Sequence, residues 1–250
     1  MAGIGTHARW ILVKKYMIAL KGHMQRANAS LEAFRKIGVD DIEIFYGIDG
    51  RREDVAKYGV RRTKVQRYWH NRFVCCSYRH SYTDSELACS LSHLALYDKL
   101  LASGDGTMLI MEDDLMPVRE GAKRVIDSLD EIAARTGCGI FFINCKDKLK
   151  PFHQKFMEIN GVKVCSIGAG KWNWLINRRK TVDYTSGYVI TREAAQRLLE
   201  LGRPASMPAD RLTGLLAYTK VDAWRTVEPY FMADPEGGSV VHYYDVGKQA

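Results

Sequence analysis

The sequence predicts an α/β protein with a Rossmann-like, mostly parallel sheet flanked by helices. Strand-like and helix-like segments alternate along most of the 250 residues, which is typical of this class. The first strand, helix and second strand fit within about 30 residues, the length of a βαβ unit. Further along, the wholly apolar segment "TMLIM" at 107–111 leads directly into Glu112, Asp113 and Asp114. A buried strand that ends in three acids is typical of a functional strand end in such a sheet.

The expected βαβ unit lies at the start of the chain. Residues 16–20 form an apolar strand, and residues 24–37 carry apolar side chains at the three- and four-residue spacing of a helix. Gly38 supplies a helix stop, and Ile42–Tyr46 forms the second strand before the turn "YGIDG".

The middle of the chain combines a segment without clear pattern and a well-marked helix. Residues 51–82 are basic and lack clean periodicity, so we expect a long loop with a short helix. Thr83 and Glu86 have the spacing of a capping box, and they open a helix that Gly104 can end.

The second half of the chain continues the alternation. A helix is expected near 119–135, followed by a strand at 139–144. Asn160 and Gly161 form the turn of a β-hairpin. The remaining expected elements are a strand at 185–191, a helix over "REAAQRLLELG", a short helix after a proline-rich loop and a strand near 224–228.

Composition restricts the classes of function. Lys and Arg outnumber Asp and Glu by 37 to 29, so the net charge of +8 favours anionic partners, although a solvated basic surface explains it equally well. The six cysteines include no CxxC pair, which argues against a zinc ribbon and favours reduced thiols. The sequence has no run of about 18 apolar residues, and its first 20 residues lack the pattern of a signal peptide, so we expect neither a membrane span nor a signal peptide. We therefore expect a soluble cytoplasmic protein, with peripheral contact to an anionic membrane face as an alternative.

The acidic cluster is the strongest indication of chemistry. Parallel sheets bind ligands at the carboxyl ends of their strands, which is where Glu112, Asp113 and Asp114 fall. A hard divalent cation, Mg²⁺ or Mn²⁺, would relieve the repulsion between these carboxylates and bind a nucleotide diphosphate. The alternative is a solvated loop, but the apolar strand before the acids and Leu115 and Pro117 after them favour the functional interpretation.

The segment "ACSLSHLALYDKLLASGDGTMLIMEDDLMP" resembles the central signature of glycosyltransferase family 25, which includes lipooligosaccharide and collagen galactosyltransferases. Three further stretches are similar to that family. They are the first strand and helix with Arg26, the turn "YGIDG" with Asp49, and the block "TSGYVITREAAQRLLE" followed by "MPADR". The resemblance covers roughly residues 16–232.

This resemblance implies a glycosyltransferase A-type fold in a single domain, residues 1–250. Residues 16–150 would form the nucleotide-sugar-binding half, and 151–250 the acceptor half and C-terminal tail. It implies a UDP-sugar donor, usually Mn²⁺ (or Mg²⁺), inversion at the anomeric carbon and transfer of galactose. The acceptor would be a glycan, such as a lipooligosaccharide, or a protein hydroxyl, as in lipopolysaccharide biosynthesis or collagen modification. Gln25 departs from the family, which often has a second arginine before Arg26.

The resemblance also assigns donor and metal residues. Glu112, Asp113 and Asp114 would form the metal and donor motif, with Asp114 in direct contact with the metal. The other residues implied to bind the donor are Arg26, Asp49 and His93. Since His93 lies one helical turn before Tyr97, a structural histidine is the alternative. By fold-level analogy, His242 is a third metal ligand, with a surface histidine as the alternative.

The acceptor side is predicted from fewer signals. Asp210 in "MPADR" is the candidate catalytic base, and a helix N-terminal acid is the alternative. Trp172 and Trp174 are candidates for stacking on sugar, although core packing is the usual place of tryptophan. Tyr188 is a further candidate substrate contact, with a core-facing strand residue as the alternative.

Two other functions compete with sugar transfer. The net charge and the basic, aromatic run "VRRTKVQRYWHNRF" are compatible with nucleic-acid binding, but no recognised motif accompanies them, so no nucleic-acid partner is expected. A catalytically inactive carbohydrate-binding relative would keep the fold and lose the base. The presence of "EDD" and "PAD" argues against it.

Overall fold

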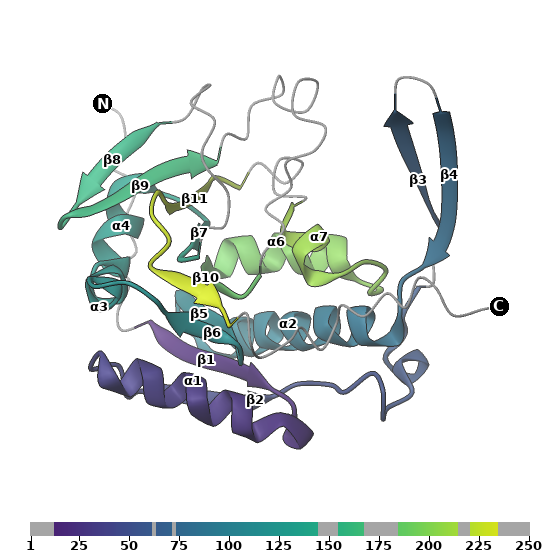
Figure 1. The fold of residues 1–250 in the computed structure, drawn as a ribbon, viewed down its shortest axis with the longest axis horizontal. Coiled ribbons are helices and arrows are strands. Elements are labelled where there is room, and N and C mark those ends of the chain that lie inside the picture. Colours follow the sequence, from purple (N-terminus) through teal and green to yellow (C-terminus); the bar gives the residue numbers. More distant parts are fainter. Residues whose placement is uncertain are drawn as a thin grey trace.

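A single mixed sheet organises the computed structural model, which describes residues 13–61, 64–71, 74–144, 155–167, 185–214 and 221–234. Its eight strands lie in the order β2-β1-β5-β10-β7-β11-β9-β8 (Figure 1). The strands are β1 (Lys14–Ala19), β2 (Ile42–Tyr46), β5 (Thr107–Glu112), β7 (Ile140–Phe142), β8 (Phe156–Ile159), β9 (Val162–Ile167), β10 (Gly187–Thr191) and β11 (Ala223–Thr226).

Most strands of this sheet point the same way. β1 is parallel to β2 and β5, and β7 is parallel to β11. β10 is antiparallel to both β5 and β7, and β9 is antiparallel to both β11 and β8. Only β10 and β9 therefore oppose the common direction among the strands of this sheet. The predicted α/β class, with a mostly parallel sheet flanked by helices, is confirmed.

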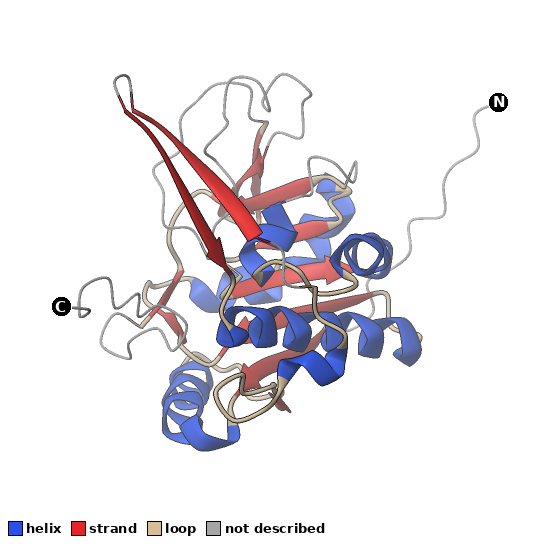
Figure 2. Ribbon diagram, turned by 90° about the vertical axis from the view of Figure 1, so that its right-hand side faces the viewer, coloured by secondary structure: helices blue, strands red, loops and turns tan. Residues whose placement is uncertain are grey.

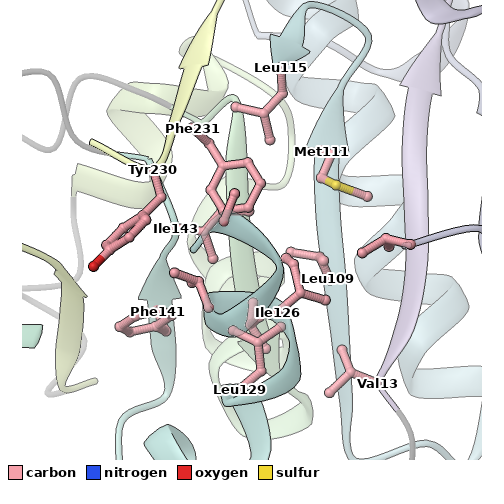
Figure 3. Close-up of a cluster of buried hydrophobic side chains, with 14 of the residues drawn as sticks. Val13, Leu109, Met111, Leu115, Ile126, Leu129, Phe141, Ile143, Tyr230 and Phe231 are labelled. Atoms are coloured by element: carbon pink, nitrogen blue, oxygen red, sulfur yellow. The ribbon is translucent and has the colours of Figure 1, made fainter. Parts of the chain in front are cut away.

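Helices cover both faces of the sheet (Figure 2). One buried cluster joins the sheet to α1, α3 and α4, and the other joins it to α2, α6 and α7. Figure 3 shows part of the first cluster, in which Leu109 of β5 lies near Ile126 of α3. The helices are α1 (Met24–Lys36), α2 (Asp84–Ser103), α3 (Ala122–Asp127), α4 (Leu129–Thr136), α6 (Arg192–Gly202) and α7 (Ala209–Gly214).

Strand β5 belongs to both cores because its side chains alternate between the two faces. Leu109 and Met111 pack in the cluster with α1, whereas Met108 and Ile110 pack in the cluster with α2. All four are at most 1% exposed. A strand that is buried on both faces has a continuously apolar sequence, which explains the segment "TMLIM".

The start of α2 follows the sequence closely. The Thr83 hydroxyl oxygen accepts a hydrogen bond from the Glu86 backbone N–H at 3.2 Å, and the Glu86 carboxylate accepts one from the Thr83 N–H at 2.8 Å. The helix ends at Gly104, whose φ of 77° is left-handed. The predicted capping box and glycine stop are confirmed.

The predicted loop at 51–82 is wrong for much of its length. The structure has a short 3₁₀ helix at Val55–Tyr58 and then two antiparallel strands, β3 (Lys64–Asn71) and β4 (Val74–Ser81), which form a ribbon projecting from the body (Figure 1). Main-chain hydrogen bonds hold a two-stranded ribbon together, so its sequence need not show the apolar alternation of a core strand.

Two smaller differences concern the segments beside β5. The helix expected near 119–135 is divided into α3 and α4 at Ser128, which is buried and follows the last turn of α3. The sequence analysis also missed a short antiparallel pair, β6 (Leu115–Pro117) with β12 (Phe231–Ala233). Strands of three residues are too short to show a periodicity. The turn of the β8–β9 hairpin is confirmed at Asn160 and Gly161, both with positive φ.

The glycine-bounded turn after β2 packs against the start of α2. A Cβ atom at Gly50 would lie 2.3 Å from the backbone oxygen of Asp84, and one at Gly47 would lie 2.9 Å from an Ile18 methyl carbon. The Ile48 N–H donates to the Ser92 hydroxyl oxygen at 2.9 Å, which ties the turn to α2. The two glycines therefore allow the turn to lie directly beside the ends of β1 and β5.

This packing makes Gly50 intolerant of a side chain. We expect Gly50→Ala to lower the free energy of unfolding by about 1–3 kcal/mol, the usual effect of overpacking. Gly106→Ala is the matched control, since a Cβ there would meet nothing within 4 Å. Chemical denaturation of both variants measures the difference. Equal stability of the two variants would show that the turn can move away from Asp84.

Candidate functional site

The candidate site is a pocket where the carboxyl ends of β1 and β5 meet the starts of α1 and α2. Five segments distant in sequence contribute to its wall: the end of β1, α1, the turn after β2, α2 and the end of β5. The residues lining it are Ile18, Ala19, Leu20, Arg26, Ile48, Asp49, Gly50, Arg51, Ser85, Cys89, Ser92, His93, Glu112 and Asp113. The structure thus brings together five of the six residues predicted to bind the donor, all except Asp114.

The alternation of β5 continues into the acids and separates them. Glu112 follows the residues that face α2, and its carboxylate accepts a hydrogen bond from the Thr185 hydroxyl at 2.8 Å and lies 3.5 Å from His93 Nε2 on α2. Asp113 follows the residues that face α1, and it forms a hydrogen-bonded ion pair with Arg26 of that helix. Neighbouring carboxylates therefore have different partners because successive side chains of a strand point to opposite faces.

Two carboxylate oxygens of the cluster are buried without a hydrogen bond. Within the described part of the chain, Asp113 Oδ2 and Asp114 Oδ1 have no hydrogen-bonding partner. The turn that carries these two aspartates is also held by the chain after β12, since the Asp234 N–H donates a hydrogen bond to the Asp114 carbonyl oxygen at 2.7 Å. Buried acceptor oxygens without donors carry a desolvation cost that a bound cation would offset.

The electrostatics of the three acids differ accordingly. Burial and the neighbouring Glu112 carboxylate raise the pKa of Asp114 from 3.8 to about 7. Burial also raises the pKa of Asp113, although Arg26 opposes the shift. Burial acts to raise the pKa of Glu112 too, but His93 and Thr185 outweigh it and the pKa is lowered. Without a cation, Asp114 therefore keeps its proton at a higher pH than Glu112 does.

Cationic groups gather on the other side of the pocket, around the turn. The Arg51 guanidinium donates to Asp49 Oδ1 at 3.1 Å and approaches His23 Nε2 at 2.6 Å. Burial alone would raise the pKa of Asp49, but the hydrogen bonds from Arg51 keep it lowered. Arg51 was not predicted as a site residue. Its place directly after the "YGIDG" turn was the only available signal.

Behind Glu112 lies a buried chain of polar side chains. His93 Nδ1 and the Tyr188 hydroxyl are 2.7 Å apart, and the Tyr188 and Tyr97 hydroxyls are also 2.7 Å apart. All three side chains are fully buried. Tyr188 therefore supports the pocket from behind its wall, and its predicted contact with substrate stays a prediction. Cys89 and Thr185, which the sequence analysis missed, also lie beside Glu112.

Asp210 lies on α7, which packs against α2, the helix that carries Cys89 and His93. It is half-buried in the first turn of α7, where its Oδ1 accepts from the Arg211 N–H at 2.7 Å. Burial raises the pKa of the Cys89 thiol well above its ordinary value, and the Glu112 and Asp210 carboxylates add to this shift. Asp210 is therefore within electrostatic range of the pocket. Trp172, Trp174 and His242 fall outside the described residues.

The chain matches the family model "Glycosyltransferase family 25 (LPS biosynthesis protein)" over residues 12–213. It is 25% identical over 185 residues to a protein of Aedes aegypti named "Glycosyltransferase 25 family member", and 26% identical over 188 residues to a protein of the same name from Anopheles gambiae. Each match covers 74% of this chain but only 27% and 28% of the mosquito proteins, so the chain spans about a quarter of their length. Within the described residues, no helix has both the length and the apolarity to cross a membrane.

The raised pKa of Asp114 has a consequence for stability. The unfolded chain releases this proton near pH 3.8 and the folded metal-free protein near pH 7, so the contribution of Asp114 to stability falls as the pH rises through that window. Asp114→Asn removes this loss. We expect its unfolding free energy to exceed that of the wild type by an amount that grows from pH 4 to about 7.

Chemical denaturation in the presence of a chelator measures this difference. Asp40→Asn is the matched control, because it changes an exposed aspartate. A difference between Asp114→Asn and the wild type that does not vary with pH would contradict the electrostatic account of the cluster.

Proposed function

Since the chain belongs to glycosyltransferase family 25, we propose that it transfers a sugar, most simply galactose, from a UDP-sugar to a hydroxyl group of a glycan acceptor. A lipooligosaccharide or a protein hydroxyl is included in this acceptor class. We further propose an A-type fold, inversion at the anomeric carbon and dependence on Mn²⁺ or Mg²⁺. The observation that carries the proposal is a pair of buried carboxylate oxygens on Asp113 and Asp114 at the end of β5, which have no hydrogen-bonding partner among the described residues.

The residues present fit a hard divalent cation. Asp114 is the first candidate ligand, and Asp113 has one oxygen free of Arg26. Carboxylate oxygens are the ligands that Mg²⁺ and Mn²⁺ prefer. When bound, such a cation would supply positive charge that neutralises the departing diphosphate. Glu112, which was predicted as a ligand, faces His93 and Thr185 in this structure, and its role as a ligand stays a prediction.

The protein's own groups would hold the donor on the opposite wall. Arg51 lines the pocket, and its guanidinium can attract an anionic diphosphate. Asp49 lines the pocket with an ionised carboxylate that can accept a hydrogen bond from a donor hydroxyl. Arg26 fixes the direction of Asp113 and so holds the acidic turn in place.

Asp210 is the proposed base on the acceptor side. Its carboxylate would remove the proton of the acceptor hydroxyl as that oxygen attacks the anomeric carbon, while the bond to UDP breaks on the opposite face. This in-line displacement inverts the anomeric configuration. The support for this role is the position of Asp210, which is half-buried and within electrostatic range of the pocket.

The metal proposal gives a direct expectation for activity. Asp114→Asn should lower Mn²⁺-dependent turnover of UDP-galactose by roughly 10²-fold or more, the scale of losing a principal electrostatic group. Asp127→Asn, an exposed change on α3, is the control and should leave turnover unchanged. Turnover is measured with a panel of nucleotide sugars and mixed acceptors, with and without a chelator. Full turnover in the presence of the chelator would contradict the proposed dependence on a metal ion.

The base proposal separates donor binding from transfer. Asp210→Asn should leave UDP binding nearly intact and lower the transfer rate by roughly 10²-fold, the usual contribution of a general base. If Asp210 only stabilises a helix start, its loss should cost about 0.3–1 kcal/mol of stability and little rate. A UDP titration, a melting curve and a transfer rate on this one variant distinguish the two roles. Loss of UDP affinity would instead place Asp210 on the donor side.

A further inference from the structure

The inner wall of the pocket carries a second group of ligand atoms, distinct from the two aspartates. One ligand atom each from Cys89, His93 and Glu112 lie within 4.8 Å of one another. Cys89 and His93 are four residues apart on α2, so they share a face of the helix, and Glu112 meets them from the end of β5. A thiol, an imidazole and a carboxylate are the three side-chain types that bind zinc.

The imidazole of His93 is arranged as a ligand. Its side chain is fully buried, and Nε2 has no hydrogen-bonding partner within the described part of the chain. The nearest carboxylate oxygen, on Glu112, is 3.5 Å away, which is too long for a good hydrogen bond. The 3.5 Å between Nε2 and the Glu112 oxygen is close to the separation of two ligand atoms on one tetrahedral zinc ion, whose Zn–N and Zn–O distances are about 2.0–2.2 Å.

The other ring nitrogen is held in the way typical of metal-binding histidines. Nδ1 lies 2.7 Å from the Tyr188 hydroxyl, which in turn lies 2.7 Å from the Tyr97 hydroxyl. If Nδ1–H donates to Tyr188 and Tyr188 donates to Tyr97, the lone pair of Nε2 faces the pocket. Such outer hydrogen bonds fix the tautomer and ring orientation of a ligating histidine.

The charges of the three groups also match a divalent cation. A thiolate and a carboxylate together supply two negative charges, and a neutral imidazole supplies none, so a divalent cation would leave the buried site neutral. Binding would therefore release the thiol proton to water as the metal–sulfur bond forms.

We propose that Cys89, His93 and Glu112 form a binding site for a borderline or soft divalent cation, Zn²⁺ in particular, at the inner wall of the pocket. Thiolate and imidazole ligands select such metals, whereas the aspartates beside them offer only oxygen. The site lines an open pocket, so the metal has an entry path and a fourth position for water. This inference concerns binding alone and does not depend on the proposed sugar transfer.

Cobalt(II) is the probe that tests the site, because its absorbance shows a charge-transfer band only when a thiolate is bound. We expect the band when the metal-free full chain is titrated with Co²⁺, and we expect Zn²⁺ to abolish it and excess Mg²⁺ to leave it. Cys89→Ser should lose the band. Cys138→Ser, which removes a buried thiol from the other hydrophobic cluster, is the matched control and should keep the band.

A second variant tests the site without removing a ligand, so that loss of the band through misfolding can be recognised. Tyr188→Phe retains the ring and removes only the hydroxyl beside His93 Nδ1, so we expect Co²⁺ affinity to fall by roughly 10- to 100-fold with the band still present at saturation. Melting curves establish that each variant is folded. The proposal is overturned if the folded wild type gives no band, if Cys89→Ser keeps the band, or if folded Cys138→Ser loses it.

Discussion

The structure depends on the position of β5 between two hydrophobic cores. The strand pairs with β1 on one side and β10 on the other, and its alternate side chains fill both faces of the sheet. A slip of one residue would move every side chain to the opposite face, so the register is fixed by burial on both sides. The same register fixes where the strand ends, and therefore where the three acids leave the core.

The remaining parts of the pocket are arranged to meet these acids. Arg26 comes from α1, His93 from α2, and Thr185 from the segment just before β10. α1 and α2 cover opposite faces of the sheet, but their side chains meet at the end of the sheet where the carboxyl ends of β1 and β5 lie side by side. Gly47 and Gly50 allow the turn after β2 to lie against β1 and α2, and Gly50 lines the pocket.

The sequence predicted those features that leave a local pattern. The capping box of α2, the Asn160–Gly161 turn and the apolar β5 were each visible in a few neighbouring residues. The β3–β4 ribbon was missed because main-chain pairing leaves no required side-chain pattern.

The contacts between pocket residues that are distant in sequence could not be predicted for a different reason. The distance of Cys89 from Glu112 depends on how α2 packs on β5, which no spacing within either segment encodes. Thr185 likewise meets Glu112 only because β10 pairs with β5.

One property of the acidic motif could nevertheless have been derived from the sequence and the fold class. In a strand, Glu112 must point to the face of Met108 and Ile110, and Asp113 to the face of Leu109 and Met111. The first two of these acids therefore leave the strand on opposite faces of the sheet.

The structure shows this division. The glutamate carboxylate lies within 4.8 Å of an imidazole nitrogen and a thiol sulfur on α2, and the first aspartate is paired with an arginine on α1. The second aspartate, Asp114, lies beyond the strand with a buried oxygen that has no hydrogen bond within the described residues. One short acidic run thereby provides two chemically different environments, an oxygen-only one suited to a hard cation and a mixed one suited to a softer cation.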